Sequence, residues 1–143
     1  MEQELTNSDA LYAAAVLKLG QDASPKDLVD DDVACAETVS NLIQKIIPSF
    51  PTFTGTWTLW AYLKKDTRFK QMILSEPGCV IISPTGTGNG RLRNGHVGIL
   101  GKDGIIMSND SASGLLLENF NLTSWRQKYQ AVGGFPVYFF KII

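Results

Sequence analysis

The segments EPGCVIIS (residues 76–83) and GHVGIL (residues 95–100) mark a change in the hydrophobic pattern of the chain. Before them, apolar residues recur at helical spacing. From residue 79 onward they form short runs bounded by glycine, proline and asparagine, which is typical of strands. This order of helices followed by strands predicts an α+β fold, with N-terminal helices packed on an antiparallel β-sheet.

Two of the predicted helices are bounded by ordinary start and stop signals. The first covers residues 10–19, with Asn7 or Ser8 as its N-cap and Gly20 as its C-terminal stop. The other covers residues 56–65, which are rich in aromatic and leucine side chains. Both lie upstream of the change in pattern, as an α+β order requires.

A longer amphipathic helix is predicted between them, over VACAETVSNLIQKII (residues 33–47). Asp31 and Asp32 are its candidate N-caps, and a short helical turn is predicted to begin at Ser24. Its apolar side chains recur at intervals of three and four residues, which places them on one helical face. They are Cys35, Val39, Leu42, Ile43 and Ile46.

The second half of the chain is predicted to form the sheet. The turn Lys102-Asp103-Gly104 separates two apolar runs that should pair as a hairpin. A capped helical turn is predicted at residues 123–129, before the last strand. Because no linker or internal repeat is visible, residues 1–143 are interpreted as one domain. The predicted strands are residues 79–83, 96–100, 105–109 and 136–143.

Residues able to perform polar chemistry are scarce. The chain has one histidine and two cysteines among 143 residues, which excludes a zinc finger or ribbon, and neither a metal nor a cofactor is expected. Any imidazole base must be His96, and any thiol nucleophile must be Cys35 or Cys79. The glycine-rich run PTGTGNGRLRNG (residues 84–95) lacks the Lys-Ser/Thr pair of a P-loop, so we interpret it as a strand connection.

Charge is distributed unevenly along the chain. Residues 1–37 carry a net charge of −7 and residues 38–143 carry +6. This asymmetry fits two attracting faces of one domain, or a basic surface that meets a polyanion. No run of bases is interleaved with aromatic residues, so nucleic acid is not an expected partner. No apolar run is long enough for a membrane span.

The N-terminal segment begins with acidic residues and lacks the basic region of a signal peptide. We therefore expect synthesis in the cytoplasm without a signal peptide. In that reducing compartment Cys35 and Cys79 are expected to be free thiols, although their pairing as a disulfide is also open.

Cys35 and His96 each have a functional and a structural interpretation. Cys35 lies near a predicted helix N-terminus, where amides and the helix dipole lower a thiol pKa, but it also lies on the apolar face of the helix. His96 begins a predicted strand directly after a glycine-rich loop. There it could act as a catalytic base, or it could be a solvent-exposed histidine at the edge of the loop. A cysteine on a helix, then a histidine on a strand, then a polar residue on the next strand is the order of a thiol–imidazole catalytic site.

PGCVII (residues 77–82) and GHVGI (residues 95–99) resemble the core motifs of the NlpC/P60 cysteine peptidases, whose papain-like core the CHAP amidohydrolases share. The segment ACAETVS (residues 34–40) resembles the cysteine-bearing helix start of that family, and the resemblance extends over residues 30–115. Two positions depart from the family pattern: Ala34 and Cys79 stand where the family usually has aspartate. Cys79 is therefore interpreted as a bystander thiol.

The resemblance places the third catalytic residue on the strand after His96. The usual family spacing falls on Ser108, whereas Asn109 offers a carboxamide oxygen that is better suited to orient an imidazole. Because neighbouring residues of a strand face opposite sides, only one of the two can face His96. We favour Asn109, with Ser108 as the alternative and Asp110 as a more distant one.

The resemblance implies a peptidoglycan hydrolase that cuts an amide bond of stem peptides or crosslinks, with Cys35 as nucleophile and His96 as base. Bacterial peptidoglycan would be its partner, and a phage lysis or virion enzyme acting at the cell wall is the favoured setting. A papain-like transferase or deamidase, or a non-catalytic virion or interaction module, are the alternatives. Candidate substrate contacts are Trp57, Trp60, Tyr12 and Arg93 with its neighbour Arg91, each of which could instead be a core or solvated residue.

Overall fold

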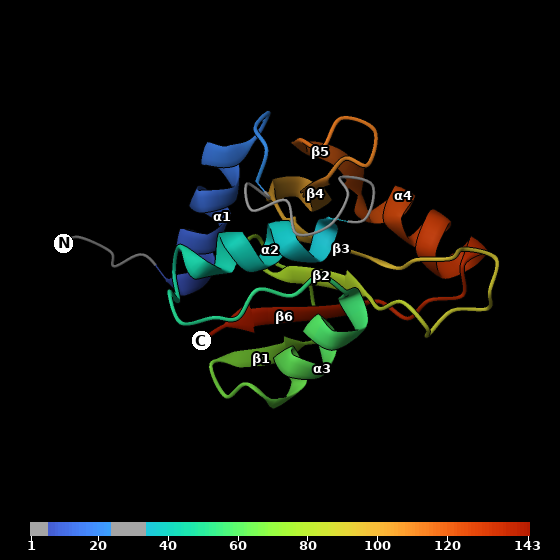
Figure 1. Ribbon diagram of the computed structural model, residues 1–143, viewed down its shortest axis with the longest axis horizontal. Helices are drawn as coiled ribbons and strands as arrows, with labels where there is room; N and C mark the ends of the chain where they lie inside the picture. Colours follow the sequence, from blue (N-terminus) through green and yellow to red (C-terminus); the bar gives the residue numbers. More distant parts are fainter. Residues whose placement is uncertain (1–5, 24–33) are drawn as a thin grey trace.

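The centre of the molecule is an antiparallel six-stranded sheet. The structure is a computed structural model, and it describes residues 6–23 and 34–143. The strand order is β1-β6-β2-β3-β4-β5, and every neighbouring pair is antiparallel. The predicted α+β class is confirmed (Figure 1). The strands are β1 (Phe69–Met72), β2 (Val80–Ser83), β3 (His96–Leu100), β4 (Ile105–Asn109), β5 (Leu116–Asn121) and β6 (Tyr138–Ile142).

Helix α1 (Asn7–Lys18) begins earlier than predicted because its cap is Thr6. The Thr6 hydroxyl accepts the backbone N–H of Asp9 at 3.0 Å, and the Asp9 carboxylate accepts the backbone N–H of Thr6 at 3.2 Å. This reciprocal pair is a capping box, so Asn7 and Ser8 are helical residues and not the cap. Gly20 follows the helix with a φ of 78°, as expected for its stop.

Helix α2 (Cys35–Gln44) is shorter than the predicted helix of residues 33–47. Its N-cap is Ala34, which has no side chain able to accept a hydrogen bond. The predicted caps Asp31 and Asp32, and the predicted turn at Ser24, lie outside the described residues.

The strand predictions hold best around the hairpin. β3 and β4 have the predicted bounds and pair antiparallel, and helix α3 (Thr56–Lys65) also has its predicted bounds. β1 and β5 were not predicted and form the two edges of the sheet. The predicted helical turn at residues 123–129 lies within α4 (Leu122–Trp125) and the π-helix η3 (Arg126–Val132).

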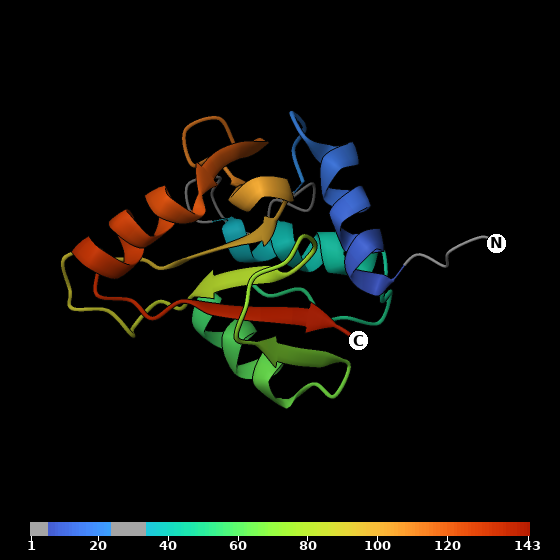
Figure 2. The same cartoon turned by 180° about the vertical axis from the view of Figure 1, so that it is seen from behind.

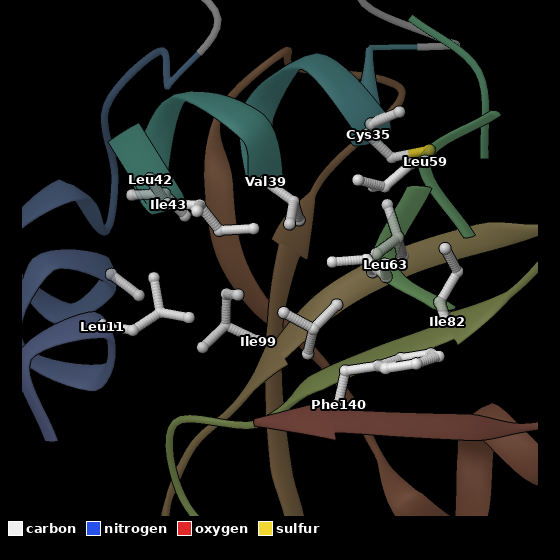
Figure 3. Close-up of a cluster of buried hydrophobic side chains, with 14 of the residues drawn as sticks. Leu11, Cys35, Val39, Leu42, Ile43, Leu59, Leu63, Ile82, Ile99 and Phe140 are labelled. Atoms are coloured by element: carbon white, nitrogen blue, oxygen red, sulfur yellow. The ribbon is translucent and has the colours of Figure 1, made fainter. Parts of the chain in front are cut away.

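Two apolar clusters cover the two faces of the sheet. Alternate residues of β2 divide between them: Val80 and Ile82 pack with the helices α1, α2 and α3, whereas Ile81 packs with α4 and η3. Figure 3 shows the first cluster, with Cys35 at the end of the α2 row. In the view from behind, the strands lie in front of α2 and α3 (Figure 2). No helix within the described residues is long and apolar enough to cross a membrane.

Candidate active site

A cavity of about 580 Å³ lies where β3 begins. Its lining combines residues from both sides of the sheet: Cys35 belongs to the cluster under α2, and Tyr129 belongs to the cluster under η3. His96, the first residue of β3, lines the cavity between them. The structure therefore brings together the two residues that the sequence singled out as nucleophile and base.

Cys35 is the first residue of α2, and only 9% of it is exposed. Burial raises the pKa of its thiol to about 11, although the backbone N–H groups of Val97, Ala36 and Cys35 itself lower it. The contact with Val97 matters because that residue follows His96 directly. Cys35 is thus a protonated thiol at neutral pH, held at a helix start and beside the start of β3.

His96 is enclosed by aromatic rings. Its ring stacks on Trp125 at a centroid distance of 5.2 Å and on Tyr129 at 5.5 Å, and Phe120 lies at 5.6 Å. With 8% exposure it is not a solvent-exposed residue of a loop edge. Burial, and to a smaller extent the positive charge of Lys128, lower the pKa of the imidazole to about 3.

Ser108 is a hydrogen-bond partner of His96. The Ser108 Oγ lies 2.9 Å from His96 Nε2, and the Ser108 hydroxyl donates to Asn119 Oδ1 at 2.6 Å. This contact favours Ser108, the alternative, over Asn109 as the residue that holds the ring. Strand alternation explains the outcome, because Ser108 shares the side of β4 with Ile106 and faces the aromatic side of the sheet. Asn109 lines the cavity too.

The start of β3 is held by a polar network from three segments. Thr56 Oγ1 lies 2.9 Å from Thr85 Oγ1 and accepts the Thr85 backbone N–H at 2.8 Å. Thr85 Oγ1 in turn accepts the backbone N–H of Gly95 at 3.0 Å. These bonds tie α3 and the loop after β2 to the residue that precedes His96.

A second buried contact fixes the aromatic wall of the site. The Trp125 Nε1–H donates to Ser83 Oγ at 3.1 Å, and Ser83 is paired with His96 in the sheet. Trp125 and Ser83 are both fully buried, so this hydrogen bond fixes the orientation of the indole beside His96.

Two of the five candidate substrate contacts line the cavity, and Arg91 is not one of them. They are Trp57, which is 50% exposed, and Arg93. Trp60 does not line it: its ring stacks on Tyr138 and packs against the core below α2. Tyr12 also packs against that core and does not line the cavity.

Cys79 lies away from the site. It is fully buried in the cluster on the α4 side, and both cysteines are free thiols. Within residues 6–23 and 34–143, no group of three or more histidine, cysteine, aspartate or glutamate side chains could hold a metal ion.

The sequence interpretation missed several residues of the site. A partial signal was available: residues 116–121, taken as a strand after β4, would have placed that strand beside Ser108, but regular pairing sets Asn119 opposite Met107, and only the bulge brings it to Ser108. The aromatic enclosure had no such signal, because it depends on how η3 packs against the sheet. The missed residues are Asn119, Phe120, Trp125, Lys128 and Tyr129.

The arrangement combines a thiol at a helix start with an imidazole held through one of its two nitrogens. Such a site can transfer the thiol proton to the other ring nitrogen and form a thioester with an acyl group. No family model and no curated protein matches the chain.

Proposed function

We propose that this chain is a cysteine hydrolase that cleaves amide bonds in peptidoglycan stem peptides or crosslinks. The observation that carries the proposal is the shared cavity of Cys35 and His96, in which Ser108 holds the imidazole by Nε2. The resemblance of residues 77–82 and 95–99 to the NlpC/P60 peptidases supports it, and a papain-like core is part of the same proposal. The sheet and the cysteine-bearing helix α2 are compatible with such a core.

The proposed reaction begins with two neutral groups. As Cys35 Sγ attacks the carbonyl carbon of the scissile amide, its proton passes to Nδ1 of His96. The proton then goes to the amide nitrogen, the C–N bond breaks, and the amine leaves. Water next attacks the thioester while His96 takes its proton and returns it to Cys35, which releases the new carboxylate.

Burial determines the protonation states of Cys35 and His96 before the first step. Because the thiol pKa is raised to about 11 and the imidazole pKa lowered to about 3, a preformed thiolate–imidazolium pair is disfavoured in the free protein. Proton transfer therefore accompanies the attack on substrate. The N–H groups of Cys35 and Ala36 at the start of α2 are positioned to stabilise negative charge on sulfur.

The charges of the cavity suit a short peptide with free acidic and basic groups. Arg93 and Lys128 bring positive charge to its lining, Asp110 brings negative charge, and Trp57 adds an apolar surface. Stem peptides of peptidoglycan carry carboxylates that arginine and lysine can bind.

The test is digestion of purified peptidoglycan followed by mass spectrometry of the released fragments. We expect new amine and carboxyl termini with the wild type, and loss of release by at least about a thousandfold in Cys35→Ala and His96→Gln. Cys79→Ala is the matched control, because it removes the other buried thiol far from the cavity, and it should keep the activity. No new termini with the wild type would contradict the proposal, and equal release by Cys35→Ala would contradict the mechanism.

A non-catalytic module that retains the fold is the second candidate. The burial of Cys35 and the aromatic enclosure of His96 favour it, because both side chains then serve as packing groups. The same digestion separates the candidates. Binding of the wild type to peptidoglycan without release of fragments would support the module.

A further inference from the structure

The hydroxyl of Ser108 bridges His96 and Asn119. It lies 2.9 Å from His96 Nε2 and donates to Asn119 Oδ1 at 2.6 Å. A serine hydroxyl has one proton, and a carboxamide oxygen only accepts hydrogen bonds. With its proton committed to Asn119, Ser108 can only accept from His96, and the ring proton must then lie on Nε2.

We propose that Asn119 is a positioning residue that fixes the tautomer of His96 through Ser108. A buried hydroxyl without Asn119 could rotate and donate to Nε2, which would move the ring proton to Nδ1. An imidazole in that state has no lone pair on Nδ1 with which to take the proton of Cys35. The catalytic consequence rests on the proposed function, whereas the tautomer itself does not.

The sheet carries Asn119 at an irregularity that fits this role. Ile106 pairs with Phe120, but Ser108 pairs with Leu117, so two residues of β5 stand opposite one residue of β4. Asn119 is one of the two. Bulges of this kind re-aim a side chain near functional sites, and here the amide oxygen reaches the hydroxyl of the neighbouring strand.

Because the bridge is buried, the direction of its hydrogen bonds affects stability. Ser108 is fully buried and His96 nearly so. In such surroundings an unsatisfied donor or acceptor is costly, so the three groups stabilise one consistent direction of hydrogen bonding. Asn119 also lines the cavity, where the imidazole meets the thiol side.

The test uses the fact that the chain has a single histidine. In ¹⁵N-labelled protein at neutral pH, long-range ¹H–¹⁵N spectra show one imidazole and distinguish its Nε2–H from its Nδ1–H form. We expect Nε2–H in the wild type and in Asn119→Asp, whose carboxylate still only accepts. We expect a mixture of forms in Asn119→Leu and Asn119→Ala, and the unchanged Nε2–H form in Glu118→Leu, the matched control on the same bulge.

Several results would overturn the inference. They are an Nδ1–H form in the wild type, an unchanged tautomer in a folded Asn119→Leu or Asn119→Ala, and loss of the Nε2–H form in Asn119→Asp. If peptidoglycan is cleaved, Asn119→Leu should lower kcat about tenfold or more with little change in KM, and Asn119→Asp should restore part of it. A wild type that holds the Nε2–H form but cleaves nothing supports this inference and contradicts the proposed function.

Discussion

The imidazole of His96 is a polar group placed in an apolar enclosure, and its protonation state follows from that. Rings of Trp125, Tyr129 and Phe120 surround it, and its one hydrogen-bond partner among the bonds described above is the neutral hydroxyl of Ser108. Within residues 6–23 and 34–143 no carboxylate compensates a charge on the ring, and burial is the main cause that lowers its pKa to about 3. At neutral pH the ring is therefore uncharged, and one of its two nitrogens carries no proton.

This low pKa makes folding stability depend on pH. The unfolded chain protonates His96 near pH 6.5 and the folded chain near pH 3, so between these values the unfolded state binds more protons. Stability is therefore full above pH 6.5 and falls as the pH drops below it. Near pH 5 the loss attributable to His96 is about 2 kcal/mol. Urea unfolding of the wild type near pH 5 and pH 7 measures it.

The matched variant is His96→Gln, which keeps an N–H donor for Ser108 but does not titrate. Its stability should change with pH only through the carboxylates, so the difference between the two proteins isolates the histidine. Identical pH dependence in both proteins would show that His96 is protonated as easily in the folded state as in the unfolded one.

The positive charge of Lys128 also lowers the pKa of His96, by less than burial does, and it can be removed by substitution. Its Nζ lies 5.3 Å from the ring centroid of Tyr129 and 5.7 Å from that of Phe120, beside the enclosure of His96. Lys128→Gln removes a positive charge that opposes protonation, so the pKa of His96 should rise while burial keeps it below 6.5. A pH titration of the imidazole ¹⁵N shifts measures the change.

Lys102→Gln is the control for that titration, because Lys102 lies over the Tyr12 ring and not at the cavity. It should leave the pKa of His96 unchanged. Equal shifts in the two variants would mean that net charge, and not the position of Lys128, controls the imidazole.

At the residue scale, the sequence was sufficient to select Cys35 and His96, which line one cavity, because it holds so few cysteines and histidines. It was insufficient for the third residue. The choice of Asn109 over Ser108 rested on side-chain chemistry, whereas strand alternation places Ser108 within hydrogen-bond distance of His96. The weak orienting power of a serine hydroxyl is offset by Asn119, a residue from a strand that the sequence did not reveal.

At the element scale, the close approach of β2 and the start of β3 determines where His96 lies. A Cβ at Gly95 would lie 1.8 Å from the backbone oxygen of Ser83. Gly95→Ala must therefore separate the strands at the site, and we expect it to cost at least about 3 kcal/mol of stability. Urea unfolding measures this cost, and the ring shifts of His96 should change with it.

Gly55→Ala is the control for the steric argument. At the N-cap of α3, an added Cβ would meet only Thr58 Oγ1, at 3.5 Å, which is ordinary contact. Its cost should not exceed about 1 kcal/mol. A Gly95→Ala protein as stable as Gly55→Ala would mean that β3 shifts without penalty.

Elements with strong local signals were predictable, and the edges of the sheet were not. α3, β3 and β4 have their predicted bounds because apolar spacing and turn residues delimit them. β1 (FKQM) has only two apolar residues, and β5 (LLENFN) alternates poorly because of its bulge. Both become strands by pairing with β6 and β4, which is a tertiary effect that a local pattern does not contain.

At the scale of the whole molecule, the site joins two cores that lie back to back on one sheet. Cys35 packs in the core under α2, and the enclosure of His96 belongs to the core under η3. The sheet keeps them in one arrangement because β2, β3 and β4 contribute side chains to both cores. No segment of the sequence alone indicates that residues 35 and 129 line one cavity.

The two thiols report on these two cores separately. Cys79 is fully buried beside the central strand β2, whereas Cys35 lines the cavity. Burial raises the pKa of both thiols, so iodoacetamide should modify each of them more slowly in the folded protein than in urea.

In Cys35→Ala, modification of Cys79 should require global unfolding and should accelerate with urea along the full unfolding slope. In Cys79→Ala, Cys35 should react faster and with a smaller urea dependence, because opening of the cavity is enough to expose it. If Cys79 reacted as fast as Cys35 without urea, the face under α4 would open by itself, and the cavity would lose one wall while the other core stayed folded.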